Sequence, residues 1–383
     1  MSTPKLRFKE FSREWENKKY QDVLNIKYGK DHKNLNSGDI PVYGTGGIMR
    51  HVNKYLYDGE SILIGRKGTI DQPKYVNEKF WTVDTLFYSE IHIDKVFPKF
   101  LYQHALQVNW LSLNEATGVP SLNTTSINNV SLSIPTLTEQ TKIATFLTAV
   151  DEKINQLSQK QELLTQYKKG MMQKLFSQQI RFKADDGSEF GAWVERTIKD
   201  IADVKGGKRL PKGYSLVAQN TGHPYITVSD MNRSYGIDHE NIKYVPIEAV
   251  DAINRYTITD KDIFISVAGT LGIIGKISSE FNGANLTENA DKLTNLKCNQ
   301  IFLIYLLDSG YLSSLIESTA TTSAQPKLAL YTIQDLKILM PLLSEQTKIA
   351  NFLSAIDQKI DLTTQQLEQA KQWKKGLLQH MFV

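Results

Sequence analysis

The sequence predicts an α+β protein, with two mixed α/β domains related by pseudo-twofold symmetry and joined by two long antiparallel coiled-coil helices. Three observations predict this fold. The chain repeats itself, each copy ends in a segment of heptad periodicity, and each copy contains short runs of β-branched and aromatic residues between Gly, Pro, Asn and Asp. With 383 residues, the chain is also too long for one ordinary domain core.

The internal repeat is the main evidence for two domains. Residues 135–176 match residues 341–382 without gaps, and 22 of the 42 positions are identical. The two copies also begin alike, because Leu6-Arg7-Phe8-Lys9 returns as Ile180-Arg181-Phe182-Lys183. Their interiors match only in fragments. We therefore expect one retained scaffold that supports two interiors with different targets.

The two matched segments predict long helices. Apolar residues recur at the 4-3-4-3 spacing of a coiled coil, and each helix should run for about 40 residues, or about 60 Å. Thr138 and Ser344 are the expected N-caps, and Glu139 and Glu345 place negative charge in the first turn. The residues expected to pair the helices are Ile143, Leu147, Val150, Ile154, Leu157, Ile349, Leu353, Ile356, Ile360 and Leu367.

Some features of these helices leave alternatives open. Each helix could instead pack only on its own domain. We expect the pairs Lys168-Lys169 and Lys374-Lys375 to lie on a solvated helix face, with contacts to a partner or to phosphate as the alternative. Gly170 and Gly376 either permit the close approach of a neighbouring helix or mark a kink.

The segments between the repeated ends predict the domain interiors. Helical stretches are expected at about residues 98–113 and 299–317, among short strands. Each stretch precedes a turn-rich segment, residues 116–122 and 322–328, and we expect these two segments to form equivalent loops.

The composition is that of an ordinary globular protein, since 41% of the residues are apolar, 22% are charged and the formal net charge is +4. Cys298 is the single cysteine and can form neither an internal disulfide nor a thiolate metal site by itself. The N-terminus lacks a signal-peptide apolar region, and we find no run of about 18 apolar residues. We therefore expect a cytoplasmic protein.

Common catalytic motifs are absent from the sequence. The run Gly206-Gly207-Lys208-Arg209 has neither the spacing nor the hydroxyl of a P-loop, and Tyr43-Gly44-Thr45-Gly46-Gly47-Ile48 is not a Gly-x-Gly-x-x-Gly turn. We find no His-Glu-x-x-His zinc motif, and the seven histidines are scattered. The sequence therefore favours binding over catalysis, with no catalytic residue, metal or cofactor expected in this chain.

The candidates for contact with nucleic acid are loop residues that combine positive charge with hydrogen-bonding side chains. Arg and Gln can read base edges, whereas Lys, Thr and Tyr more often hold phosphates. The strongest group is Gly65-Arg66-Lys67-Gly68-Thr69, because glycines let the backbone approach a strand while adjacent cations neutralise it. The full candidate set is Tyr43, Thr45, Arg50, Lys54, Arg66, Lys67, Thr69, Lys74, Lys208, Arg209, Lys212, Arg233, Lys243, Arg255, Gln325 and Lys327.

These motifs resemble those of a known family. The duplicated Glu-Gln-x-Lys-Ile-Ala-x-Phe-Leu segments at Glu139 and Glu345, the loop at residues 40–48 and the Lys-Lys-Gly helix ends resemble the DNA specificity subunit of type I restriction-modification systems. The resemblance covers nearly the whole chain and is most specific in the helical segments.

The resemblance implies that residues 1–137 and 183–343 are target recognition domains, which each read one half of a bipartite, asymmetric double-stranded DNA site. Residues 138–182 and 344–383 would be spacer helices that set the gap between the half-sites. Two methyltransferase (modification) subunits and two restriction/translocase subunits would perform adenine methylation and cleavage. S-adenosylmethionine, ATP and Mg would then belong to those partners, and this chain would be non-catalytic.

Two other classes of function remain open at this point. The chain could be a non-catalytic coiled-coil scaffold with two ligand-binding heads, or a stand-alone enzyme that modifies nucleotides. Selective retention of one gapped DNA motif would favour the specificity subunit, and methyl transfer or cleavage by the isolated chain would favour the enzyme.

Overall fold

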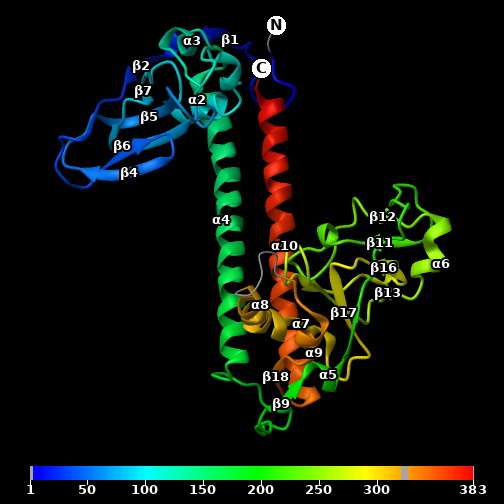
Figure 1. Ribbon diagram of the computed structural model, residues 1–383. Coiled ribbons are helices and arrows are strands. Elements are labelled where there is room, and N and C mark those ends of the chain that lie inside the picture. The colour runs from blue at the N-terminus through cyan, green and yellow to red at the C-terminus, as the bar shows by residue number, and fades with distance from the viewer. Residues whose placement is uncertain (1–2, 321–326, 383) are drawn as a thin grey trace. The chain divides into compact units, whose positions relative to one another are not determined.

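The computed structural model describes residues 3–320 and 327–382, which form two compact units (Figure 1). Unit 1 consists of Met1–Gln161 together with Thr363–Val383, and unit 2 consists of Glu162–Leu362. The domain borders predicted at residues 137 and 343 coincide with the starts of the long helices. The compact units instead divide each long helix between them.

The two long helices are α4 (Leu137–Phe176) and α10 (Leu343–Met381). In unit 1, Asp151 of α4 pairs with Lys374 of α10, and Gln161 farther along α4 donates to Thr364, which lies earlier in α10. Residue numbers rise along one helix as they fall along the other, so the two segments run antiparallel within this unit. The prediction of two helices of about 40 residues is confirmed.

The helices begin earlier than expected, so the prediction of Thr138 and Ser344 as N-caps was wrong. The first helical carbonyls are those of Thr136 and Leu342, which accept backbone N–H groups four residues later at 2.9 and 3.0 Å. The hydroxyl of Thr136 also accepts a backbone N–H, at 3.5 Å. A proline directly precedes each of these two residues. Proline has no backbone N–H and keeps the residue before it extended, so the helix begins only after the proline.

In each unit, the first and last strands of the α/β portion pair as a two-stranded antiparallel ribbon. The ribbon is formed by β1 and β8 in unit 1 and by β9 and β18 in unit 2. The elements of unit 1 before α4 are β1 (Glu16–Lys19), α1 (Tyr20–Val23), β2 (Leu24–Tyr28), β3 (Ile40–Gly44), β4 (Gly47–Val52), β5 (Tyr57–Gly65), β6 (Lys74–Thr82), β7 (Leu86–Ile91), α2 (Pro98–Ala105), η1 (Trp110–Leu113), α3 (Thr124–Asn128) and β8 (Ser131–Ile134).

Unit 2 has more and shorter elements between its ribbon strands. They are β9 (Val194–Thr197), α5 (Ile198–Ile201), β10 (Asp203–Gly206), β11 (Pro224–Ile226), η2 (Val228–Asp230), β12 (Lys243–Tyr244), η3 (Ile247–Ala249), α6 (Val250–Ile253), β13 (Thr257–Ile258), β14 (Ile263–Ser266), β15 (Ile274–Gly275), η4 (Ser279–Phe281), β16 (Ala284–Leu286), β17 (Ala290–Thr294), α7 (Gln300–Leu306), the π-helical turn η5 (Leu307–Tyr311), α8 (Leu312–Ala320), α9 (Leu330–Gln334) and β18 (Lys337–Met340).

The main sheets share three strands and then diverge. Antiparallel β2-β7-β5 in unit 1 corresponds to antiparallel β10-β17-β14 in unit 2. Unit 1 extends this core to a six-stranded sheet of order β2-β7-β5-β6-β3-β4, whereas unit 2 ends it with β15 and adds a second sheet of order β12-β11-β16-β13. The mixed α/β interiors are confirmed, and their divergence lies in the outer strands.

Both predicted interior helices are interrupted. The stretch at residues 98–113 consists of α2 and, after a turn, η1, where the side chain of Asn109 caps the backbone N–H of Ser112. The stretch at residues 299–317 is broken at Gly310, whose φ of 142° only glycine adopts readily. Of the two turn-rich segments, residues 322–326 lie outside the described residues.

Each unit has its own apolar core, built jointly by its strands, its short helices and the ends of the long helices that belong to it. One helical segment in the described part of the chain, Gln300–Ser318, is long and apolar enough by composition to cross a membrane, with a mean hydropathy of 1.2. Its residues 302–307 are buried in the core of unit 2. The first part of this segment therefore belongs to the core of unit 2.

Candidate nucleic-acid interface

A buried ion pair fixes the start of each long helix. Arg7 donates from Nε and Nη2 to the two carboxylate oxygens of Glu139 at 2.7 and 2.8 Å, and Arg181 holds Glu345 in the same way at 3.0 and 2.7 Å. Both carboxylates are only 1% exposed. Two-pronged contacts of this kind fix geometry as well as charge, so the repeated sequence builds the same joint in both units.

A second duplicated ion pair joins the two long helices within each unit. Nζ of Lys374 lies 2.6 Å from Oδ1 of Asp151 in unit 1, and Nζ of Lys168 lies 2.6 Å from Oδ1 of Asp357 in unit 2. The two lysine side chains are 16% and 13% exposed, so the prediction of a solvated face was wrong for Lys374 and Lys168, whereas their neighbours Lys375 and Lys169 are exposed as expected. The heptad pattern did not predict this ion pair between the helices, because it treats every lysine as a polar residue of the helix surface.

The expected helix-pairing residues are largely buried. They pack both against the domain interior and against the other long helix: Ile143 and Leu147 share a core with Leu377, and Ile349 shares one with Met172. The alternative that each helix packs only on its own domain was therefore wrong, because each core contains residues of both long helices. Ile143, Leu147, Val150, Leu157, Ile349, Leu353, Ile356 and Leu367 are buried, and Ile154 and Ile360 are partly buried.

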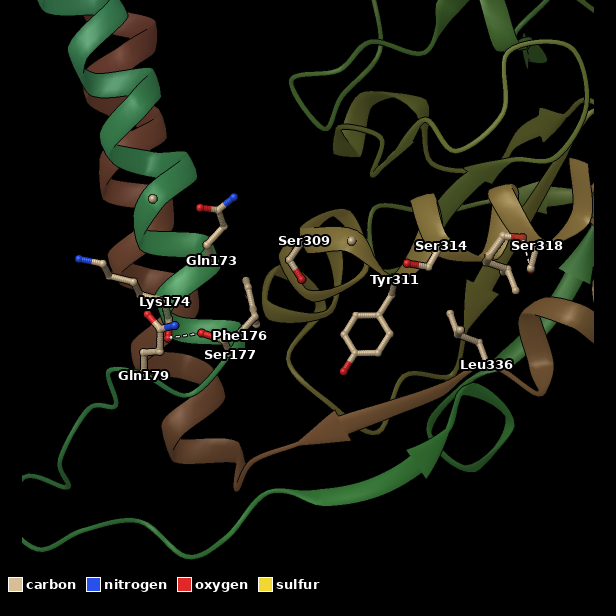
Figure 2. Close-up of a pocket in the computed structure, with 13 residues that line it drawn as sticks. Gln173, Lys174, Phe176, Ser177, Gln179, Ser309, Tyr311, Ser314, Ser318 and Leu336 are labelled. Carbon is tan, nitrogen blue, oxygen red and sulfur yellow. Dashed lines mark hydrogen bonds between the residues drawn. The ribbon is translucent and has the colours of Figure 1, made fainter.

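Neither explanation offered for the two helical glycines survives. A Cβ added at Gly170 or Gly376 would meet nothing within 4 Å, and both glycines lie inside continuous helices. Gly170 lines a groove of about 890 Å³ in unit 2, between the end of α4 and the η5–α8 segment (Figure 2). Apolar side chains of Phe176, Tyr311 and Leu336 line this groove together with serine hydroxyls.

The glycine-rich turn between β3 and β4 forms one wall of a hollow of about 630 Å³ in unit 1. The other walls come from residues 31–33 and 83–85. Thr45 lies in the turn and lines the hollow, and a Cβ on Gly47 would lie 3.8 Å from Nζ of Lys74. An exposed turn of this kind lets a polymer backbone approach closely.

The loop after β5 lies beside this turn. Its first glycine, Gly65, has no room for a side chain, because a Cβ there would lie 2.1 Å from the carbonyl oxygen of Thr69. Arg66 donates to the carbonyl of Asp84 at 3.0 Å and lies over the ring of Tyr28, 5.4 Å from its centroid. Arg66, Lys67 and Thr69 are exposed. The structure thus brings five candidates of unit 1 around one turn: Thr45, Arg66, Lys67, Thr69 and Lys74.

The other candidates of unit 1 are placed differently. Tyr43 donates its hydroxyl to Glu78 at 2.5 Å, and burial together with this carboxylate raises the pKa of Tyr43 to about 12. Arg50 is half-buried and donates to the carbonyl of Leu35 at 2.8 Å. Lys54 is exposed but follows the far end of β4 from the turn. The structure does not bring these three into the same cluster.

Unit 2 presents basic side chains after β10. Nζ of Lys208 lies 5.6 Å from the ring centroid of Tyr256, next to the exposed Arg255. Arg209 is 78% exposed and pairs with Glu288 at 2.5 Å. Lys208, Arg209 and Arg255 therefore lie close together. Of the other candidates, Lys212, Arg233, Lys243 and Lys327 are exposed on other parts of unit 2, and Gln325 lies outside the described residues.

Sequence reasoning missed several residues of these surfaces. His32 and Lys33 line the hollow in unit 1, and Nδ1 of His32 is buried without a partner among the described residues. The repeated Gly-Lys pair could have identified these loops from the sequence. A Cβ on Gly29 would lie 2.0 Å from the carbonyl oxygen of Val83, and one on Gly207 would lie 2.0 Å from that of Thr287. Each glycine thus lets the Lys-bearing loop pack against the segment before the next core strand.

The described residues contain no group of three His, Cys, Asp or Glu side chains that could hold a metal ion. Burial raises the pKa of Cys298 to about 12, so its thiol is protonated at neutral pH. Burial lowers the pKa of His104 to about 4, which keeps its imidazole neutral.

Two different α/β interiors on a repeated scaffold, each with exposed basic loops, favour the class of nucleic-acid-binding proteins. The comparisons identify its family. Residues 12–166 and 191–372 match the type I restriction modification DNA specificity domain. The chain therefore belongs to this family of DNA-binding specificity subunits of type I restriction-modification systems.

Relatives with this function are similar over most of the chain. The type I restriction enzyme MjaVIII specificity subunit of Methanocaldococcus jannaschii is 26% identical over 340 residues, which covers 84% of this chain and 76% of the relative. The putative MjaX specificity subunit of the same organism is 27% identical over 301 residues, which covers 75% of this chain and 67% of the relative.

Two solved structures share the fold. A type I restriction-modification S subunit from M. genitalium superposes with a TM-score of 0.69 at 18% identity, covering 100% of this chain and 99% of that one. A chain from a structural study of complex assembly and conformational transition in a type I R-M system gives 0.55 at 13% identity, covering 96% and 97%. At these identities the likeness concerns the fold alone.

Proposed function

We propose that this specificity subunit recognises a bipartite, asymmetric DNA site, one half-site with the interior of each unit. The observation that carries the proposal is the contrast between duplicated joints and divergent sheets. The Arg–Glu and Lys–Asp pairs repeat residue for residue, whereas the strands beyond the shared three-stranded core differ. A common scaffold with two different heads suits a site whose halves differ in sequence.

We further propose that α4 and α10 pair over their whole length, relate the two heads by a pseudo-twofold axis and act as the spacer that sets the gap. Antiparallel contacts within unit 1 and the Lys168–Asp357 pair within unit 2 support this arrangement. Half-sites on one face of B-DNA are centred about 34 Å apart per helical turn, a distance within reach of helices about 60 Å long.

The chemistry would then reside in partner subunits. Two methyltransferase subunits would methylate adenine, and two restriction/translocase subunits would translocate and cleave. S-adenosylmethionine, ATP and Mg would be bound by those partners in the cytoplasm, and this chain would direct them without catalysis of its own.

Selection of DNA from random duplexes tests the proposal. The full chain, alone and as the complex purified with its methyltransferase subunits, is mixed with the duplexes, and the retained DNA is sequenced. We expect one motif of two short half-sites separated by a fixed gap. Retention without enrichment by both preparations would instead support a scaffold that binds other ligands.

Variants in each unit sharpen this test. Arg66→Gln should relax the bases read in one half-site, and Arg209→Gln those in the other, because each replaces a cation near a candidate contact surface. Arg196→Gln is the matched control, since this exposed arginine lies on the β9 ribbon strand. If Arg66→Gln and Arg209→Gln altered the same half-site, the two-headed model would fail.

A further inference from the structure

Tyr235 has a backbone conformation that bulky residues rarely adopt. Its φ is 64°, in the left-handed region, and such a conformation persists when surrounding contacts enforce it. The carbonyl of Tyr235 accepts the backbone N–H of Lys276 at 3.0 Å. A Cβ on the neighbouring Gly275 would lie 2.5 Å from the Tyr235 carbonyl, so the two backbones are in close contact.

The side chain of Tyr235 is held by three helical residues. Its hydroxyl donates to Oδ2 of Asp308 at 2.7 Å, and its ring meets that of Tyr305 edge-on with centroids 5.2 Å apart. Nζ of Lys168 donates to the hydroxyl of Tyr235 at 3.3 Å and lies 4.5 Å from the ring centroid, within cation–π range. These contacts attach the turn that contains Tyr235 to α4, α7 and η5.

The same contacts include the ion pair between the long helices. Lys168 pairs with Asp357 of α10, and the hydroxyl of Tyr305 donates to Asp357 at 2.5 Å. Unit 1 has this joint in simpler form, with Gln103 as the donor to Asp151 at 2.9 Å. Both units therefore share the Lys–Asp pair between the long helices, and the contacts of Tyr235 with this pair's surroundings occur in unit 2.

The turn at residues 231–237 presents one cation. Its base is anchored by Met231 and Ile237, which are both buried, and the side-chain oxygen of Asn232 accepts the N–H groups of Ser234 and Gly236 at 3.0 and 3.1 Å. Between these anchors, Arg233 is exposed, and it makes no hydrogen bond or ion pair within the described part of the chain. The backbone is thus fixed on both sides of a guanidinium that is available for binding.

We propose that Tyr235 is a positioning residue for DNA recognition by unit 2, which holds the 231–237 turn against the helices so that Arg233 contacts a phosphate of the bound duplex. This inference rests on the proposed function. A planar guanidinium suits phosphate oxygens, and phosphate contacts fix a protein's register on DNA without reading bases. A fixed turn avoids the entropy loss of ordering Arg233 at the moment of binding.

A double-mutant cycle on DNA affinity tests this inference. Arg233→Gln, in the full chain within its purified complex, should weaken binding to cognate and scrambled duplexes alike by roughly 3- to 10-fold. The plot of log affinity against log salt concentration should become shallower by about 0.9, the slope expected for one phosphate contact. Tyr235→Gly removes the ring and relieves the backbone, and should weaken binding by a similar factor. The double variant should bind no more weakly than either single variant, because the tyrosine acts through the arginine.

Tyr235→Asn provides a second variant with the ring removed, since Asn tolerates the left-handed conformation. Tyr235→Phe keeps the ring contacts and should retain most of the affinity. The inference is overturned if removal of the ring weakens binding by the same factor with or without Arg233, or leaves the salt slope unchanged. Because the wild-type complex is tested separately for selection of a gapped motif, failure of the cycle and failure of the proposed function are distinguishable.

Discussion

Arg7 and Glu139 form a buried ion pair that unit 2 repeats as Arg181 and Glu345. In both pairs Nε and Nη2 of the arginine donate to the two oxygens of a carboxylate that is 1% exposed. In each unit the arginine precedes the first ribbon strand, and the glutamate lies in the first turn of the long helix that follows the second ribbon strand. This pair therefore ties the beginning of each copy to its end.

Loss of one partner should destabilise the unit strongly. Arg7→Ala leaves the buried carboxylate of Glu139 without its counter-charge, and we expect a loss of about 3–5 kcal/mol in the free energy of unfolding. Denaturant titration followed by fluorescence measures it. Lys199→Ala is the matched control, because both members of the Lys199–Asp335 pair are exposed and water screens their attraction. Equal effects of the two variants would contradict a structural role for the buried pair.

The repeated parts of the fold could be predicted from the sequence because their physical signals are local. Heptad spacing predicts the long helices, and the duplicated segments predict two equivalent joints. The ion pair between Lys168 and Asp357 escaped prediction because its members lie 189 residues apart and meet only once the helices pack antiparallel. Helix interruption at Gly310 was equally hidden, since an isolated glycine is tolerated in many helices.

The candidate interface was predictable in part for a similar reason. Glycine next to cations identified the loop at Arg66, which the structure places beside Thr45 and Lys74. The role of Tyr43 was not predictable, because its hydroxyl bonds to Glu78 across strands that pair far apart in sequence. Tertiary contacts decide which polar side chains remain available, and the sequence alone does not specify them.

His104 should make unit 1 sensitive to acid. Burial lowers its pKa from 6.5 to about 4, and its Nδ1 lies 3.0 Å from the hydroxyl of Tyr20. The unfolded chain binds a proton near pH 6.5 that the folded unit accepts only near pH 4, so stability falls as the pH decreases through this window. The loss should approach about 3 kcal/mol. His104→Gln, which keeps a hydrogen-bond acceptor, should flatten the pH dependence in thermal unfolding; a variant with the wild-type slope would exclude this cause.

Asp291 should have the opposite effect in unit 2. The side chain is 6% exposed, and burial raises its pKa to about 6, although Lys327 opposes the shift. The folded unit therefore binds a proton more tightly than the unfolded chain, and stability falls as the pH rises from about 4 through 6. Asp291→Asn should stabilise the protein by about 1–2 kcal/mol at pH 7.5 and have little effect at pH 4. Asp335→Asn on the surface is the control, and a gain from Asp291→Asn that is equal at both pH values would refute the assignment.

The chain ends in unit 1 occupy the place of a continuous segment in unit 2. The backbone N–H of Leu6 donates to the carbonyl of His380 at 2.8 Å, and that of Ile180 donates to Lys174 at 3.2 Å, at the equivalent position. A circular permutant of this 383-residue sequence, with its first and last residues joined by a short polar linker and new ends near residue 178, should therefore fold. Circular dichroism and the selected DNA motif measure the outcome. We expect both to match the wild type, and loss of the fold would show that the equivalence is confined to local hydrogen bonds.

Extending the two long helices together should lengthen the gap in the recognised site. One heptad inserted in α4 after Gln161 and one in α10 before Thr364, where the two residues are joined by a hydrogen bond, adds about 10 Å at about 1.5 Å per residue. B-DNA rises about 3.4 Å per base pair, so the gap should grow by about three base pairs while the bases of both half-sites stay the same. Insertion in α4 alone is the control: it shifts one helix against the other, separates Lys168 from Asp357 or Lys374 from Asp151, and should abolish selective binding. A change in the bases read at constant gap would mean that α4 and α10 do not act as the spacer.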